Sequence, residues 1–240
     1  MKRPRDPPEA SETKGDATLR ILRDLPLHAR VALLVRHSAR EHGSVVDGRP
    51  TPEDRWLLTP QGRVDARDFG TRLPAFTNLF LTHTRIERTR HTAEEIAAGF
   101  RQAHPKAHVA IEGVDPALGL ATFYARDLAL RDQWREKLGE DFYDAWLKGE
   151  IPPTVLVPIE EAVSDLVERL RLKSEQNPAS SLQIAVTHDV YVFAMREVLF
   201  GTRAETRPRI GFLEGILLAW DPAGHLEARW VDEPVPAGPE

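Results

Sequence analysis

The sequence predicts an α/β protein, a three-layer α/β/α sandwich with a mostly parallel central sheet and a small helical insertion. Short apolar runs recur along the chain, and they are continuous, as in strands that are covered on both faces. Amphipathic helical patterns separate these runs, and alternating strands and helices favour a parallel sheet. The alternation stops between Asp115 and Pro158, where apolar residues recur at helical spacing.

Six apolar runs are predicted to form the strands. They span residues 31–35, 78–81, 108–111, 182–186, 215–220 and 226–231. The residues DPAG separate the last two runs, a composition typical of a hairpin turn.

Two helices are predicted from their caps and their apolar faces. The first has Thr59 as its N-cap, Pro60 at its first position and an end before Pro74. The other spans 161–173, with an apolar face formed by Val163, Leu166, Val167 and Leu170.

A further helix is predicted over 84–100. Thr84 and Glu87 have the spacing of a capping box, which predicts that the helix starts at Arg85. Arg88 then falls in or just after the first turn, beside unpaired backbone N–H groups. An arginine in that position suits a phosphate or another oxyanion.

The segment 115–158 is predicted to be helical. Its apolar residues recur every four positions, with Gly139 as a break: Leu130, Trp134, Leu138, Phe142 and Trp146. This pattern fits either an insertion over one edge of the sheet or extra core helices. Residues 1–17 and 232–240, rich in Pro and charge, are expected to be disordered tails of a single domain over 18–231.

The composition excludes several classes of function. With 32 Lys and Arg against 37 Asp and Glu, the net charge is −5, so the charge balance does not suggest a nucleic-acid partner. No apolar run is long enough for a membrane span, and the first 20 residues contain no apolar segment, so a cytoplasmic protein is expected. The chain has no Cys, and its histidine pairs lack metal-ligand spacing, so no metal or cofactor is expected.

Two histidines directly follow two of the predicted strands. Arg36 and His37 come after the strand at 31–35, and His188 and Asp189 follow the strand at 182–186. In open α/β sheets the ligand site lies at the carboxyl ends of the strands, so these residues are candidates for a site.

At these separations, four segments together resemble the histidine phosphatase superfamily, which includes the phosphoglycerate-mutase-like and acid-phosphatase-like enzymes. The segments are LVRHSAR, LTPQGRVDARDFGTRLP, THTRIERTRHTAEEIAAGF and VTHDVYVFAMREVLFG. The resemblance covers roughly residues 31–111 and 182–200 well and the segment between them poorly. Two positions depart from the usual pattern, since Ser38 replaces a Gly and Thr89 replaces an Ala.

The resemblance implies a phosphomonoester hydrolase that acts on a small phosphorylated metabolite, without metal, through a phosphohistidine on His37. It also implies that Arg36, Arg40, Arg88 and His188 hold the phosphoryl group. Crowding by these arginines is expected to disfavour the protonated form of His37, which keeps the imidazole nucleophilic.

The sequence leaves the proton donor open. The acid-phosphatase-like enzymes use an Asp directly after the second histidine, so the resemblance implies Asp189 as the preferred general acid, with Glu112 and Asp115 as alternatives. Asp189 is also open to a second interpretation, as the N-cap of the following helix.

Two other functions remain open, a phosphomutase and a catalytically weak phosphate-binding protein of the same fold. A mutase needs a site for a second phosphate, and the basic residues of the insertion are Arg126, Arg131 and Arg135. Contacts to the rest of the substrate are expected from Arg49, Trp56, Tyr124 and Trp134, for which simple packing of the Trp residues is the alternative.

Overall fold

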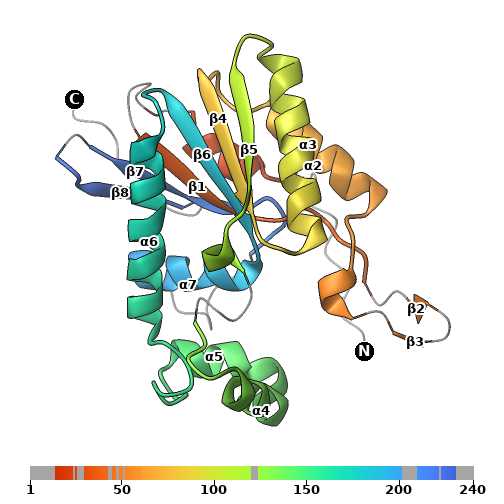
Figure 1. The fold of residues 1–240 in the computed structure, drawn as a ribbon, viewed down its shortest axis with the longest axis vertical. Helices are drawn as coiled ribbons and strands as arrows, with labels where there is room; N and C mark the ends of the chain where they lie inside the picture. The colour runs from red at the N-terminus through yellow and green to blue at the C-terminus, as the bar shows by residue number, and fades with distance from the viewer. Residues whose placement is uncertain are drawn as a thin grey trace, which may run out of the picture.

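The computed structural model describes residues 14–23, 25, 30–42, 45–46, 49–50, 52–119, 124–201, 210–221 and 223–230. A six-stranded sheet lies at its centre, in the order β5-β4-β6-β1-β7-β8 (Figure 1). The strands are β1 (Arg30–Arg36), β4 (Asn78–His83), β5 (His108–Val114), β6 (Ser181–Thr187), β7 (Gly215–Trp220) and β8 (Leu226–Arg229). All six strands predicted from the apolar runs are present.

The sheet is mostly parallel, as predicted. β5, β4, β6 and β1 run parallel, whereas β7 pairs antiparallel with β1 and β8 pairs antiparallel with β7. Successive residues of the central strand β1 face opposite layers, with Leu33 in one apolar cluster and Leu34 in the other. The continuous apolar run is therefore explained by burial on both faces.

Helices cover both faces of this sheet. α1 (Asp16–Ile21), α2 (Pro60–Thr71) and α3 (Glu87–Ala103) contribute to the cluster around Leu33. α6 (Ile159–Gln176) and α7 (Asp189–Phe200) contribute to the cluster around Leu34. Figure 1 shows α6 on one flank of the sheet and α2 with α3 on the other. The three-layer architecture is thus confirmed.

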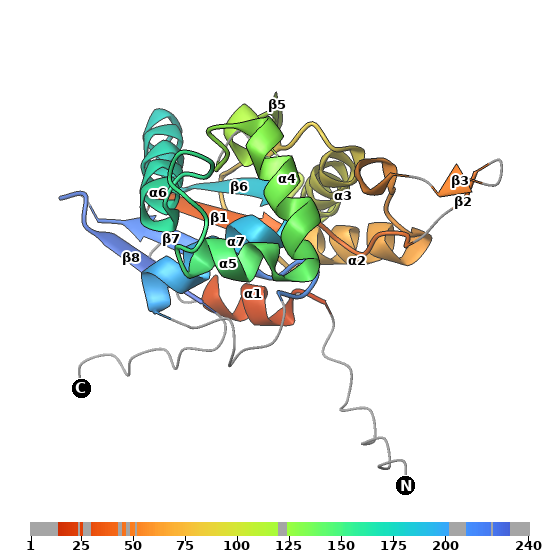
Figure 2. The same ribbon diagram turned by 90° about the horizontal axis from the view of Figure 1, so that it is seen from below.

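The insertion forms two helices, α4 (Leu128–Leu138) and α5 (Phe142–Leu147), joined by the short η3 (Gly139–Asp141). Gly139 has a φ of 57°, a left-handed conformation that favours glycine and explains the predicted break. In Figure 1 the two helices lie below the sheet, and in Figure 2, seen from below, they lie in front of it. α5 buries Phe142 and Trp146 in the core, whereas α4 has no buried residue. α5 therefore fits the interpretation as an extra core helix, and α4 fits the interpretation as an insertion at the edge of the sheet.

Several predicted boundaries differ from the structure. The helix predicted over 161–173 is α6, which is longer at both ends, and α3 ends at Ala103 and not at residue 100. α3 begins at Glu87 and not at Arg85, with no side-chain cap at its N-terminus. The capping box fails because the Thr84 hydroxyl accepts from the backbone N–H of Ile86, while the Glu87 carboxylate accepts from Arg90. At the N-terminus, α1 begins inside the expected tail 1–17 and buries Thr18, Leu19 and Ile21. Residues 1–13 and 232–240 lie outside the described residues.

The start of α2 is held directly against the chain that follows β1. Thr59 caps this helix through a 2.9 Å hydrogen bond from the backbone N–H of Gly62, as predicted. A side chain at position 62 has no room, because a Cβ there would lie 2.1 Å from the carbonyl oxygen of Ala39. Glycine thus lets α2 approach the segment that carries His37.

Four short elements complete the described structure: β2 (Val45–Val46), β3 (Arg49–Pro50), η1 (Glu53–Arg55) and η2 (Pro116–Leu118). None of the helices in the described part of the chain combines the length and the apolar character that a membrane crossing requires.

Candidate active site

The ends of β1 and β6 place two histidines side by side. These strands are parallel neighbours in which Arg36 lies opposite Thr187, so the residues that follow them meet at one edge of the sheet. The backbone N–H of His37 donates to the carbonyl of Thr187 at 2.9 Å. The rings of His37 and His188 have centroids 5.4 Å apart and are inclined at 70°.

His37 is held in one tautomer. Its Nδ1 lies 2.7 Å from the carbonyl oxygen of Ser38, and a carbonyl only accepts, so Nδ1 carries the proton. Its Nε2 accepts from Nε of Arg88 at 3.1 Å. Burial lowers the pKa of His37 well below its usual value, and the neighbouring His188, Arg88 and Arg36 lower it further. The ring is therefore neutral, and its Nε2 lone pair points at the Arg88 guanidinium inside the pocket.

Arg88 links the two histidines. It lies in the first turn of α3 and is almost completely buried, and its Nη2 is 3.3 Å from Nδ1 of His188. Its backbone carbonyl accepts from the hydroxyl of Thr92 at 2.7 Å, and that hydroxyl accepts from the backbone N–H of Ser38 at 3.1 Å. One threonine therefore connects the N-terminal turn of α3 to the peptide beside His37.

His188 is oriented from its other side by Thr84. Nε2 of His188 lies 3.3 Å from the Thr84 hydroxyl oxygen. Because Nδ1 faces an arginine donor, the proton of the neutral ring lies on Nε2 and is donated to Thr84. Burial lowers the pKa of His188 to about 3, with Arg88, Arg36 and Arg40 adding to the effect.

Arg36 and Asp189 form an ion pair at the rim of the site. Nη2 of Arg36 lies 3.1 Å from Oδ2 of Asp189, whose side chain is 56% exposed. The Arg36 guanidinium also donates to the carbonyl of Ile210 and stacks 4.4 Å above the ring of Phe212. Both groups of the pair thus face the pocket in fixed positions.

These side chains line a pocket of about 390 Å³. It is bordered by Arg36, His37, Arg40, Asp54, Arg88, Arg135, Tyr143, His188, Asp189 and Val190. All six residues singled out from the sequence lie here, brought together from β1, α3 and the end of β6 with the first turn of α7. Arginine guanidiniums around a neutral imidazole suit a phosphoryl group.

Comparison with solved structures identifies the architecture. YhfR of Bacillus stearothermophilus is 17% identical, with a TM-score of 0.53 over 83% of this chain and 95% of its own. The phosphoserine phosphatase of Entamoeba histolytica, in complex with 3-phosphoglyceric acid, is 16% identical, with a TM-score of 0.53 over 82% and 94% of the two chains. The phosphoglycerate mutase of Bacillus anthracis is 12% identical, with a TM-score of 0.50 over 85% and 94%.

The chain has the histidine phosphatase fold. No protein-family model matches the sequence. No curated protein matches it either. The structural likeness at these identities therefore carries the assignment of the fold, which is the fold that the sequence motifs predicted.

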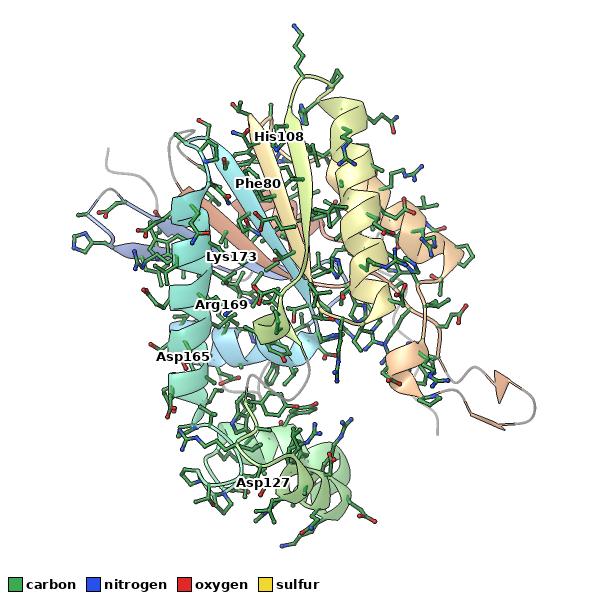
Figure 3. All side chains as sticks on the ribbon, viewed as in Figure 1. Phe80, His108, Asp127, Asp165, Arg169 and Lys173 are labelled. Carbon is green, nitrogen blue, oxygen red and sulfur yellow. The ribbon has the colours of Figure 1, made fainter. Side chains whose placement is uncertain are left out.

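Within this histidine phosphatase fold, the two alternative proton donors lie outside the pocket. Glu112 is 3.4 Å from Lys173. Asp115 is buried, pairs with Arg169 at 2.7 Å and accepts from the backbone N–H of Ala117. Figure 3 shows Arg169 and Lys173 along α6, above the lower end of the sheet where β6 ends. Both carboxylates are thus engaged on the flank of the sheet.

The N-cap interpretation of Asp189 is wrong. His188 occupies the N-cap position of α7, and Asp189 is the first helical residue. The helix begins one residue earlier than an N-cap at Asp189 requires, and the Asp189 carboxylate accepts from the adjacent N–H of Val190 and faces Arg36.

The predicted substrate contacts have different outcomes. Trp56 lies under Arg40, with the guanidinium 4.3 Å from its ring, whereas Tyr124 and Trp134 pack in or against the apolar core. The side chain of Arg49 lies outside the described residues. Of the three basic residues in the insertion, Arg126 pairs with Glu161 and Arg131 with Asp132, and Arg135 alone lines the pocket.

Three pocket residues were not predicted from the sequence: Asp54, Tyr143 and Val190. Val190 had a usable signal, since it follows the second histidine by two positions. Asp54 and Tyr143 had none, because their segments reach the pocket only through the tertiary fold. Among the residues that the structure describes, no group of three or more His, Asp or Glu side chains is arranged to hold a metal ion.

Proposed function

We propose that this protein hydrolyses small phosphomonoesters through a phosphohistidine on His37, without a metal ion. One observation carries the proposal. The imidazole of His37 is neutral, and its Nδ1 donates a hydrogen bond to a carbonyl, so its Nε2 is the nitrogen that faces the pocket lined by arginines. The solved phosphoserine phosphatases of Entamoeba histolytica, one bound to 3-phosphoglyceric acid and a mutant bound to phosphoserine, also support a small phosphorylated ligand.

The proposed reaction has two steps. Nε2 of His37 attacks the phosphorus atom, the bond from phosphorus to the ester oxygen breaks, and Asp189 gives its proton to the departing alkoxide. Water then attacks the phosphohistidine while Asp189 takes up a proton, which releases phosphate and restores His37. Arg36, Arg40 and Arg88 hold the phosphoryl oxygens, where negative charge resides throughout the transfer, and Arg88 turns from the two histidines toward the phosphoryl group to do so. The neutral His188 borders the phosphoryl group, with its Nε2 proton donated to Thr84.

The test is a panel of phosphomonoesters, assayed with and without a chelator, on the wild type and His37→Ala. We expect hydrolysis that is insensitive to the chelator and abolished in the variant, with a trapped phosphate that is acid-labile and base-stable. His83→Ala is the matched control. His83 is the last residue of β4, and its Nδ1 hydrogen-bonds to the carbonyl of the next residue at 2.7 Å, but it does not line the pocket. Activity that requires zinc or magnesium, or that survives in His37→Ala, contradicts the proposal.

A phosphomutase is the second candidate, because Arg135 adds a cation to the same pocket. A mutase returns the phosphoryl group to an alcohol, whereas a hydrolase gives it to water. Hydrolysis in ¹⁸O-labelled water separates the two, since a hydrolase incorporates the label into phosphate and a mutase does not.

A further inference from the structure

Two side chains of opposite charge line the pocket without an ion-pair partner in the described part of the chain. They are Asp54 in η1 and Arg135 in the last turn of α4. The other charged groups of the pocket are engaged by the protein, as in the pair between Arg36 and Asp189. Asp54 and Arg135 also do not pair with each other, so a ligand group can reach each of them.

The two charges reach the pocket from different elements. Asp54 lies two residues before Trp56, which is fixed beneath the guanidinium of Arg40 at 4.3 Å. Arg135 comes from the insertion, as does Tyr143. Burial raises the pKa of Tyr143, and the nearby Asp189 raises it further while Arg135 opposes the change. The Tyr143 phenol is therefore a neutral donor within electrostatic reach of both Asp189 and Arg135.

This places Arg135 on the leaving-group side of the site. If Asp189 gives a proton to the ester oxygen, as the proposed function requires, the alcohol attached to that oxygen lies near Tyr143 and Arg135. An arginine fork binds a carboxylate with two parallel hydrogen bonds. Asp54 is an acceptor without donors, and an ammonium group supplies what it lacks.

We propose that Arg135 and Asp54 form a subsite for a zwitterionic leaving group, and that the preferred substrates are O-phosphorylated amino acids. Arg135 binds the carboxylate and Asp54 binds the ammonium. The pocket volume of about 390 Å³ lies near the small end of ligand sites and suits an alcohol of a few heavy atoms. The inference rests on the proposed function and adds the class of substrate to it.

Three substrates separate the two recognition groups. O-Phosphoserine has both charges, phosphoethanolamine lacks the carboxylate, and 3-phosphoglycerate has a hydroxyl in place of the ammonium. For the wild type we expect kcat/KM for phosphoserine to exceed both others by at least about tenfold, the usual effect of one charged hydrogen bond.

Each variant is expected to remove the preference over one of the two comparison substrates. In Arg135→Gln the kcat/KM ratio of phosphoserine to phosphoethanolamine is expected to fall toward one. In Asp54→Asn the kcat/KM ratio of phosphoserine to 3-phosphoglycerate is expected to do the same. Arg131→Gln is the matched control, because Arg131 lies on the same helix and pairs with Asp132 outside the pocket, and both ratios are expected to persist in it. Equal kcat/KM values for the three substrates in the wild type, or ratios that persist in Arg135→Gln and Asp54→Asn, overturn the inference.

Two further measurements separate this inference from the proposed function. If p-nitrophenyl phosphate is hydrolysed in a reaction that requires His37 but the ratios are flat, the proposed function stands and the subsite fails. Calorimetric binding of phosphoserine and phosphoethanolamine to His37→Ala tests the subsite without turnover. A preference for phosphoserine there supports the subsite even if the wild type hydrolyses neither ligand, and equal binding refutes it.

Discussion

At the scale of single residues, the site depends on which nitrogen of each histidine carries the proton. The Thr84 hydroxyl accepts from Nε2 of His188 and from the N–H of Ile86, and so leaves Nδ1 of His188 facing Arg88. We predict that Thr84→Val lowers kcat/KM for phosphomonoesters by about tenfold to a hundredfold, in line with losing one hydrogen bond at a charged site. Thr84→Ser is expected to restore most of the activity.

The readout beyond activity is the tautomer of His188, measured by nitrogen NMR chemical shifts, which we expect to become mixed in Thr84→Val. Thr82→Val is the control, because Thr82 is a buried threonine in β4, two residues before Thr84, whose hydroxyl makes no hydrogen bond among the described residues. A full loss of activity in Thr82→Val, or an unaltered tautomer in Thr84→Val, argues against this role.

Asp189 carries a second prediction at this scale. Asp189→Asn is expected to slow an alkyl phosphate strongly and p-nitrophenyl phosphate much less, because that phenolate leaves without protonation. Losing the ion pair to Arg36 affects both substrates alike, so the ratio of the two rates isolates proton donation. A differential seen in Glu112→Gln or Asp115→Asn, and absent from Asp189→Asn, transfers the role to that residue.

At the scale of elements, the loop before β7 holds Arg36 in place. The ring of Phe212 lies 4.4 Å below the Arg36 guanidinium and 5.8 Å from the ring of His37. Leu213 has a φ of 62°, a strained conformation for a bulky residue, and α1 secures it, because Thr18 donates to the Leu213 carbonyl at 2.9 Å. The N-terminal helix thus supports the phosphate pocket through this loop.

Phe212→Leu is expected to raise KM for phosphomonoesters by about twofold to thirtyfold, the range for one cation–π contact. Phe212→Tyr keeps an aromatic face under Arg36 and is expected to remain near the wild type. The inhibition constant of inorganic phosphate checks the same effect without turnover. Equal effects of leucine and tyrosine refute a contribution of the aromatic face.

At the scale of the whole molecule, the buried histidines make folding depend on pH. The pKa of His188 falls from 6.5 to about 3 on folding, so below pH 6.5 the unfolded chain binds a proton that the folded one excludes. Stability is therefore lost as pH falls below 6.5, by about 2 kcal/mol at pH 5 from this residue. Denaturant unfolding of the wild type and His188→Gln at pH 7 and pH 5 measures it. A wild type that loses no more stability than the variant contradicts the prediction.

The sequence by itself determined the sheet and the six pocket residues that follow its strands or begin its helix. Continuous apolar runs report burial on both faces directly, and parallel strands end at the same edge, so His37 and His188 were predictable neighbours. Local patterns also fixed the N-cap at Thr59, because its hydrogen bond lies within four residues.

The tertiary structure decided the features that depend on distant neighbours. The Thr84 hydroxyl, predicted to cap α3, instead meets His188, 104 residues away, and a capping pattern contains no information about such a partner. The same holds for Asp54 and Tyr143, which reach the pocket only because η1 and the insertion fold over one edge of the sheet. Local hydrogen bonds and burial can thus be predicted from the sequence. The groups that surround the ligand are brought together by packing between segments far apart in the chain.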